Sequence, residues 1–446
     1  MHRLKSPLTA QLELTEACNN ACIHCYNYWR YLESGKRVCS DSHEKGLSHF
    51  QLLLDNLIAK EVRTVTFTGG EPFLRRDVLF DLIAAAKKGE MKAGVNTNGA
   101  LITEDDVSHL KDVGTDFLLV SLLSDTPDVH NKVVNSNTHG STSKAIADLA
   151  KAGLSVTTNM VVSSQNWDRV RQTALYIQDL GVKDFCATPV MPCPLAEEHP
   201  GLLLKPEQVK QVFDDLLWVK QQGMNVDVLE PLVHCMFSRE ERLRFSQFLD
   251  RRSCAAGISD MAISPDGDAR PCILATESCG NLITDGWEKV WGNLAGWCSP
   301  NLLPDECLNC AVVDECGGGC RIAALSGSGE INGRDPYMTS PLGPVADEAT
   351  NDQIVTSALS REAVIAFPSD VAMRDEEFGS VVFKGRNFIF LDNDGTKLLK
   401  HLRCRGSFTM QSIVEEFDIE KNGLASFLDV LLSRGFLNSV ATKGGE

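Results

Sequence analysis

Three cysteines lie close together near the start of the chain, in the spacing Cys18-x3-Cys22-x2-Cys25, directly after a short apolar run. Three thiolates can hold three corners of a cubane iron–sulfur cluster, which leaves the fourth iron without a protein ligand. An open metal position is where a cofactor or substrate can bind and react. Structural zinc is the alternative, although such a site normally closes with a fourth Cys or His nearby. We therefore expect an iron–sulfur cluster at this loop.

A second cysteine system lies in the C-terminal half of the chain. Its members are Cys254, Cys272 and the close array Cys307-x2-Cys310-x5-Cys316-x3-Cys320. Three consecutive glycines before the last cysteine let the backbone bend, so that the thiolates can converge on metal. The spacing indicates further iron–sulfur sites, and a structural zinc ribbon is the alternative.

A glycine turn, Thr68-Gly69-Gly70-Glu71-Pro72, follows the second predicted strand. Glycines let a backbone approach a ligand closely, and exposed backbone groups can bind polar atoms of that ligand. A simple Gly-Gly turn that closes a strand is the alternative.

The elements that must position these motifs alternate between short β-type runs and amphipathic helices. Strands are predicted at residues 11–15, 63–68, 92–96, 117–121, 155–162 and 183–188. Helical faces lie between them, and two of the helices are predicted to stop at Gly153 and Gly181. Six β–α units imply a parallel sheet with helices outside it. The first cysteine loop directly follows the first strand, at the end of the sheet where active sites of such folds lie.

The first cysteine motif, followed by Tyr26 and then by Gly69, Gly70, Glu71 and Pro72, resembles the signature of radical S-adenosylmethionine (SAM) enzymes. The resemblance implies an α/β fold with a partial (β/α)6 TIM-like barrel. It also implies that SAM chelates the free iron and that the glycine turn holds the SAM amino group. Tyr26, Asn98 and Ser121 are further implied contacts of SAM. Relatives often carry a later arginine that helps to bind SAM. Here the text is His130-Asn131-Lys132-Val133-Val134, with no arginine at that offset, so the partner of the SAM carboxylate stays open and Lys132 or Lys144 could substitute.

The second cysteine system resembles the SPASM extension of radical SAM enzymes, which holds auxiliary 4Fe–4S clusters. Carried over, one cluster would use Cys254, Cys272 and Cys320, and a second would use Cys307, Cys310 and Cys316. The family usually adds one last cysteine after Asp-Pro-Tyr, where this chain has Met338. Each of the one or two auxiliary clusters is therefore short of a ligand. Cys235, Cys279, Cys298 or Asp335 could complete them, or an iron could stay open.

The tail has its own pattern, a hairpin at residues 380–391 followed by three helices. This predicts a small winged-helix-like α+β domain. Its order resembles the PqqD-like recognition element of ribosomal-peptide maturation enzymes, which binds the leader of a precursor peptide. A generic packing or dimerisation domain is the alternative. The predicted divisions are residues 1–200 (barrel), 201–253 (helical connection), 254–345 (SPASM), 346–362 (linker) and 363–446 (recognition).

Composition restricts the partners. The net charge of −17 argues against nucleic acid and anionic membranes. The chain shows neither a signal peptide nor a long apolar run, so a cytoplasmic location is expected. Sixteen cysteines then point to metal chemistry rather than disulfides. Because the resemblance implies that SAM is cleaved at a reduced cluster, a flavodoxin or ferredoxin is the expected electron donor.

These observations together predict a radical SAM peptide maturase of the ribosomal-peptide (RiPP) type. Reductive cleavage of SAM at the first 4Fe–4S cluster would give a 5′-deoxyadenosyl radical, which abstracts hydrogen from a residue of a precursor peptide. A C–C or C–S (thioether) cross-link would follow. The alternatives are an enzyme acting on a tetrapyrrole or other small molecule, a leader-independent protein maturase, or a non-catalytic iron–sulfur or leader-binding protein. The sequence points to no particular catalytic acid or base.

Overall fold

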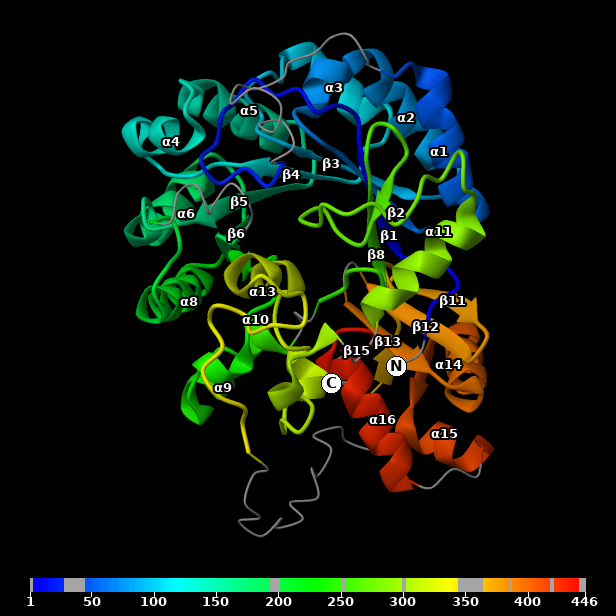
Figure 1. Ribbon diagram of the computed structural model, residues 1–446. Helices are drawn as coiled ribbons and strands as arrows, with labels where there is room; N and C mark the ends of the chain where they lie inside the picture. The colour runs from blue at the N-terminus through cyan, green and yellow to red at the C-terminus, as the bar shows by residue number, and fades with distance from the viewer. Residues whose placement is uncertain are drawn as a thin grey trace, which may run out of the picture. The chain divides into compact units, whose positions relative to one another are not determined.

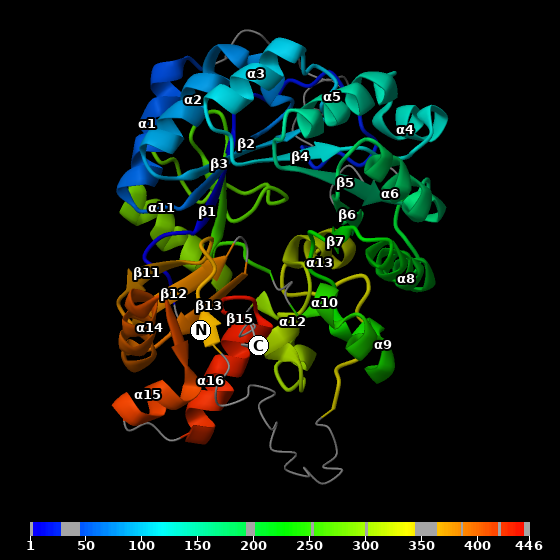
Figure 2. The same ribbon diagram turned by 180° about the vertical axis from the view of Figure 1, so that it is seen from behind.

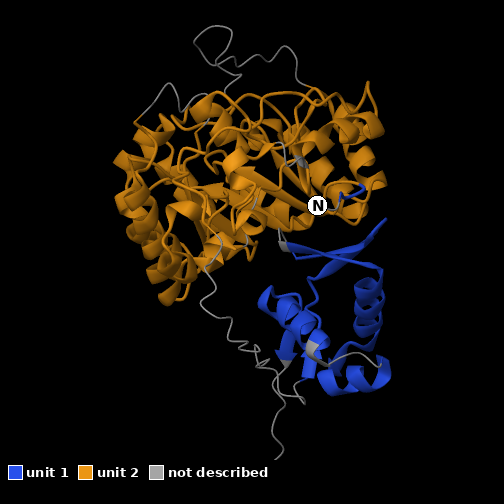
Figure 3. Ribbon diagram, turned by 60° about the horizontal axis from the view of Figure 1, so that its bottom comes forward, with its two compact units in different colours: residues 1–5, 345–446 blue, residues 6–344 orange. Residues whose placement is uncertain are grey.

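The computed structural model describes residues 3–27, 45–192, 201–250, 254–298, 302–343, 364–384, 387–417 and 421–440. The chain forms two compact units, one of residues 6–344 and one of residues 1–5 with 345–446 (Figure 3). The predicted linker at residues 346–362 lies outside the described residues.

The larger unit is built on a sheet with the strand order β7-β6-β5-β4-β3-β2-β1-β8-β9. The strands are β1 (Thr9–Glu13), β2 (Thr64–Thr68), β3 (Lys92–Thr97), β4 (Phe117–Ser121), β5 (Val156–Val162), β6 (Asp184–Pro189), β7 (Asn225–Asp227), β8 (Asp260–Ile263) and β9 (Ala269–Arg270). Strands β1 to β6 are parallel neighbours in chain order, which confirms the six predicted strands and the parallel sheet.

Helices follow these strands and lie along the outer face of the sheet (Figures 1 and 2). They are α1 (Leu47–Ala59), α2 (Arg76–Lys88), α3 (Glu104–Asp112), α4 (Pro127–Val134), α5 (His139–Lys151), α6 (Val170–Asp179) and α8 (Pro206–Gln221). Their apolar faces pack on the sheet; Leu79, Leu82 and Ile83 of α2, for example, are fully buried. Each such side chain contributes roughly 1.5–3 kcal/mol of burial free energy. Gly153 and Gly181 follow α5 and α6 at positive φ, which confirms the two predicted glycine stops.

Three strands at the two ends of the sheet, β7, β8 and β9, were not predicted from the sequence. Strand β7 pairs with β6, within a stretch predicted to be helical and connecting. At the other end β8 pairs in parallel with β1, and β9 pairs antiparallel with β8. Strands of two to four residues carry no periodic signal, because their pairing depends on a neighbour far away in the chain. Strands β8 and β9 bring the cysteine-rich segment onto the same sheet as the first cysteine loop.

The remaining elements of this unit are short. Its further helices are α9 (Arg239–Arg244), α10 (Ser246–Leu249), α11 (Trp287–Leu294), α12 (Val313–Cys316) and α13 (Arg321–Ser328). Its 3-10 turns are η3 (Pro72–Arg75), η4 (Trp167–Arg169), η5 (His234–Met236), η6 (Ala295–Cys298) and η8 (Asp305–Cys307). Within the described ranges, none of the helices has the length and apolar character needed to cross a membrane.

A buried ion pair joins the first strand to the strand that leads into the cysteine-rich segment. Arg270 Nη2 lies 2.6 Å from Glu13 Oε2, and the two side chains are 4% and 1% exposed. Arg270 Nη1 also donates to the Ala275 carbonyl at 3.0 Å. The pair therefore connects the C-terminal end of β1 with the chain on both sides of Cys272.

The described residues of the smaller unit form two three-stranded sheets, ordered β14-β10-β15 and β11-β12-β13, and three helices. Its elements are β10 (Val364–Ala366), β11 (Ala372–Glu376), β12 (Gly379–Lys384), β13 (Asn387–Leu391), α14 (Asn393–Arg405), β14 (Ser407–Thr409), α15 (Met410–Phe417), α16 (Lys421–Ser433) and β15 (Asn438–Val440). The antiparallel pairing of β12 with β13 confirms the predicted hairpin, and the three helices are those predicted.

The buried pair gives a first testable prediction. Arg270→Met keeps most of the side-chain volume but leaves the Glu13 carboxylate buried without its guanidinium, so the free energy of unfolding should fall by about 3 kcal/mol or more. Chemical denaturation followed by circular dichroism measures this. Lys60→Ala is the matched control, because it removes the exposed contact of Lys60 with Glu288 and should cost less than about 1 kcal/mol. Equal losses in the two variants would contradict the role given to Arg270.

Candidate functional site

The first cysteine loop, residues 14–27, leaves β1 and is held by backbone hydrogen bonds to other segments. Leu14 N donates to the Thr68 carbonyl at the end of β2, at 2.9 Å. Ala21 N and Ile23 N donate to the carbonyls of Val134 and Val133, at 2.9 and 3.0 Å. The last turn of α4 therefore holds the stretch that contains Cys22. This turn belongs to the segment in which the expected arginine is missing.

The glycine turn contacts the cysteine loop directly. Gly70 N donates to the Thr15 carbonyl at 2.6 Å, and Glu71 N donates to the Ala17 carbonyl at 2.8 Å. A Cβ at Gly70 would lie 1.6 Å from the Ala17 carbonyl oxygen, so no larger residue fits there. Gly69 has a φ of +121°, a conformation that L side chains rarely adopt. The two glycines are therefore required for the two loops to touch.

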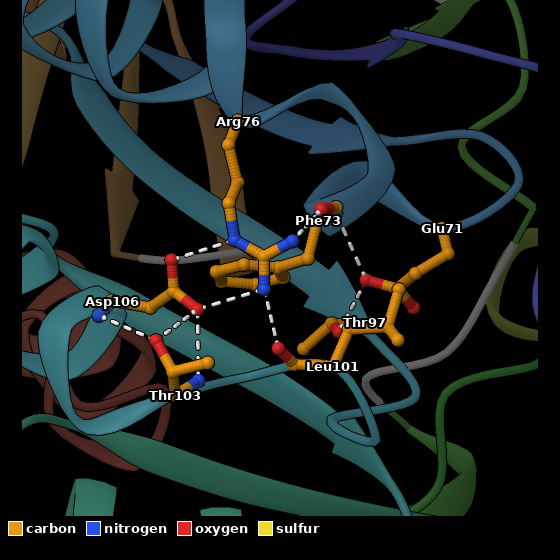
Figure 4. A network of polar contacts seen from close by, with 7 residues as sticks. All are labelled: Glu71, Phe73, Arg76, Thr97, Leu101, Thr103 and Asp106. Carbon is orange, nitrogen blue, oxygen red and sulfur yellow. Dashed lines mark hydrogen bonds and ion pairs between the residues drawn. The ribbon is translucent and has the colours of Figure 1, made fainter.

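Glu71 joins the glycine turn to the loop after β3. Its carboxylate accepts hydrogen bonds from Phe73 N (3.1 Å), Thr97 Oγ1 (2.7 Å) and Asn98 N (2.9 Å), two of which are drawn in Figure 4. Burial raises the pKa of Glu71, although these hydrogen bonds and the charge of Arg76 act in the opposite direction. Pro72 then begins η3 and turns the chain into α2. Glu71 thus fixes the loops after β2 and β3 relative to each other.

Asn98 reaches the first cysteine. Its Nδ2 donates to Asn19 Oδ1 at 2.8 Å and lies 3.8 Å from Cys18 Sγ, while its Oδ1 accepts from Ala100 N at 2.9 Å. Asn98 therefore lies beside a predicted cluster ligand, where an amide N–H can donate to a thiolate sulfur. Among the other predicted SAM contacts, Tyr26 is half-buried within the cysteine loop, and Ser121 is half-buried at the end of β4.

One supporting network was missed from the sequence. Arg76 forms a two-pronged ion pair with Asp106, with Nε and Nη2 each 2.8 Å from a carboxylate oxygen (Figure 4). The same guanidinium donates to the carbonyls of Phe73 and Leu101. Asp106 in turn accepts from Thr103 in the capping box of α3. The Thr103–Asp106 spacing was the available sequence signal, since it is typical of a helix start.

The predicted cysteines of the second system fall into two groups. Burial raises the pKa of Cys254, Cys272 and Cys320, to about 12 for Cys272, and the nearby Cys254 thiol adds to the rise at the other two. Burial likewise raises the pKa of Cys307 to about 11, with Cys316 and Cys310 as the next contributors. The resemblance implies the same two sets, and their roles as cluster ligands stay predictions. Thiols in such surroundings ionise when a metal cluster takes up their charge.

The second group surrounds a pocket. Cys307, Cys310 and Cys316 line it together with Met338 and one further thiol, that of Cys235. Within the described ranges, no three His, Cys, Asp or Glu side chains converge as the ligands of one metal ion. A cubane cluster has a different demand, because each thiolate binds a separate iron at its own corner. The donor set around this pocket fits a cluster of that kind.

Asp335 and Arg321 support the two cysteine groups. The Asp335 carboxylate accepts from Cys320 N at 3.1 Å and from Tyr337 N at 2.9 Å, so this candidate ligand is already occupied by backbone groups. Arg321 is buried and donates to the carbonyls of Leu302 and Gly333, both at 3.1 Å. Its charge acts to lower the pKa of Cys254, Cys307 and Asp335, against burial. A buried cation here offsets the negative charge of thiolates.

Two of the other candidates for a missing ligand are not placed at this pocket. Cys279 is half-buried and does not line it. The side chain of Cys298 lies outside the described residues.

Comparison with known proteins gives the class of this site. Residues 12–177 match the family model described as the radical SAM superfamily. The chain is 26% identical over 391 residues to the mycofactocin maturase MftC of Mycolicibacterium smegmatis, covering 85% of this chain and 92% of the relative. It is 28% identical over 343 residues to the antilisterial bacteriocin subtilosin biosynthesis protein AlbA of Bacillus subtilis, covering 72% and 68%.

Solved structures show the same fold. SuiB of Streptococcus suis bound to SAM superposes with a TM-score of 0.60 at 18% identity, covering 75% of this chain and 78% of that one. SuiB bound to its precursor peptide SuiA superposes with a TM-score of 0.59 at 16% identity, covering 75% and 76%. The chain thus has a mixed α/β radical SAM fold with a parallel sheet. Residues 12–177 match the radical SAM domain, and the chain is an enzyme whose cofactors include a 4Fe–4S cluster and SAM.

The contact between the glycine turn and the cysteine loop gives a second prediction. Gly70→Ala should displace the loop that carries Cys18, and SAM cleavage should fall on the order of 10²-fold, because small misplacements of reacting groups have effects of that size. Deoxyadenosine formation and iron content measure the two consequences. Gly140→Ala in α5 is the control, since nothing lies within 4 Å of its added Cβ. An unchanged rate in the Gly70 variant would contradict the structural role of the turn.

Proposed function

We propose that this enzyme modifies a ribosomally made precursor peptide. The observation that carries the proposal is the extent of the similarity to the maturase MftC, which spans 85% of this chain and therefore includes the cysteine-rich segment as well as the radical SAM domain. The similarity to AlbA, which is named for bacteriocin biosynthesis, supports the same class of substrate.

In this proposal Cys18, Cys22 and Cys25 hold the cluster that binds SAM. When bound, the cluster and SAM supply a carbon radical that removes a hydrogen atom from an unreactive C–H bond. The protein's own residues position and protect that chemistry. Gly69, Gly70 and Glu71 fix the cysteine loop, and Asn98 donates toward Cys18. Exposed backbone at the glycine turn and Ser121 at the end of β4 are the proposed contacts of SAM.

Cys254, Cys272 and Cys320 are proposed to hold one auxiliary cluster, and Cys307, Cys310 and Cys316 to hold part of another. Cross-linking of a peptide removes two hydrogens, one as an atom and one as a proton and an electron. The electron that leaves with this proton needs an acceptor. An auxiliary cluster is proposed to take it. The pair Glu13–Arg270 supports this arrangement, because it connects β1 to the segment around Cys272.

The smaller unit is proposed to bind the leader of the precursor peptide. Among the described strands, β13 forms one edge of the sheet β11-β12-β13. Ile389 packs toward the core of the unit, whereas Phe388 and Phe390 contact each other, with Phe378 at the edge of Phe390. An edge strand can accept an extended peptide as an additional strand. The aromatic rings offer apolar surface to the side chains of such a peptide.

The modification itself gives a third prediction. The gene neighbourhood is first searched for a short open reading frame that encodes a precursor peptide. Co-expression of that peptide with the enzyme should yield a product whose mass is lower by two hydrogen atoms. Fragmentation mass spectrometry locates the C–C or thioether bond. The triple variant Cys18→Ala, Cys22→Ala and Cys25→Ala should leave the peptide unmodified. If the enzyme cleaves SAM but leaves the peptide unchanged, the result would contradict the proposal and favour a small-molecule substrate.

The tail gives a fourth prediction. Removing residues 345–446 should abolish tight binding of the full precursor peptide. The rate of SAM cleavage should stay within about two-fold of the wild-type rate, because these residues, together with residues 1–5, form a compact unit of their own. Fluorescence anisotropy with the labelled peptide measures binding, and deoxyadenosine formation measures cleavage. Binding that survives the deletion would show that the leader is recognised elsewhere.

A further inference from the structure

The pocket of the second cysteine group is lined by four thiols. Cys307 and Cys316 end η8 and α12, Cys310 lies in the turn between them, and Cys235 comes from η5, which is some 70 residues earlier in the chain. Cys307 and Cys316 are only 8% and 7% exposed, whereas Cys235 is half-buried. The other lining residues are apolar or glycine, including Val233 and Met338. Four thiols around a small apolar pocket match the ligand set of a 4Fe–4S cluster.

Backbone contacts hold Cys235 at this pocket. The neighbouring His234 N donates to Cys316 Sγ at 3.4 Å, so the chain at η5 lies directly against a predicted ligand. On the other side, Thr339 Oγ1 donates to the Cys235 carbonyl at 2.6 Å. Thr339 follows Met338, the residue that stands where a last cysteine was expected. The segment that lacks the expected thiol therefore binds the residue that brings another thiol to the same pocket.

We propose that Cys235 is the fourth thiolate ligand of the auxiliary cluster held by Cys307, Cys310 and Cys316. This assignment of Cys235 takes one premise from the proposed function, namely that an auxiliary cluster is bound by Cys307, Cys310 and Cys316. Met338 also lines the pocket, but a thioether is a neutral and weak ligand, and cubane clusters are held by thiolates. With four thiolates this cluster has no iron left open for substrate. A fully ligated cluster of this kind is suited to electron transfer. The cluster of Cys254, Cys272 and Cys320 has three thiolates, so it would be the one with an iron that lacks a thiolate ligand.

The test uses the full-length protein, reconstituted anaerobically with iron and sulfide. Wild type with three cubanes should bind about 12 iron per chain. Cys235→Ala leaves three thiolates and one iron without a protein ligand, so the iron content should fall below that of wild type and the wild-type electron paramagnetic resonance signal of this cluster should be lost. Cys404→Ala is the control, because Cys404 is an exposed cysteine in α14 of the smaller unit and is not a candidate ligand of any cluster. It should keep the wild-type iron content.

A second variant separates a lost ligand from a damaged fold. Met338→Cys, added to Cys235→Ala, supplies a thiolate to the same pocket and should restore the iron content and the missing signal. Iron that stays low in this double variant would assign Cys235 a packing role and overturn the proposal. Wild-type iron and spectrum in Cys235→Ala alone would overturn it too. Wild type that binds only about 4 iron would refute the auxiliary clusters themselves, whatever residue 235 does.

Discussion

The first cysteine loop has no regular secondary structure of its own, so its position depends on backbone hydrogen bonds to the segments around it. The contact with the glycine turn is the closest of these, because Gly70 lies against the Ala17 carbonyl with no room for a Cβ. The end of α4 holds the other side of the loop. Three cysteines can present their thiolates to one cluster only if this irregular stretch is fixed, and these main-chain contacts fix it.

Side-chain networks then connect the strand ends that surround the loop. Glu71 accepts from the segments after β2 and β3, and Arg76 ties the same region to the start of α3 through Asp106. Both carboxylates have several donors, which a buried carboxylate requires. These hydrogen bonds connect the loops at the C-terminal ends of the strands, where the SAM-binding residues are proposed to lie.

The cysteine-rich segment is an extension of the same sheet in this structure. Strand β8 pairs with β1, and Arg270 of β9 pairs with Glu13 at the end of β1. Electron transfer between clusters needs fixed distances, and a shared sheet with a buried ion pair provides a fixed connection. A flexible tether between separate domains would not.

The sequence by itself determined the kind of chemistry and the main scaffold. The spacing of Cys18, Cys22 and Cys25 and the adjoining glycine turn are local patterns, and the six parallel strands and their helices follow from periodicity within short windows. The tertiary structure alone placed what depends on distant partners: the edge strands β7, β8 and β9, the Glu13–Arg270 pair, and the position of Cys235 beside Cys307, Cys310 and Cys316. In the sequence, Cys235 follows His234 in a connecting segment and belongs to no cysteine motif. The other three thiols of its pocket lie some 70 positions or more further along the chain. Folding brings them together, and only then can the missing ligand at Met338 be explained.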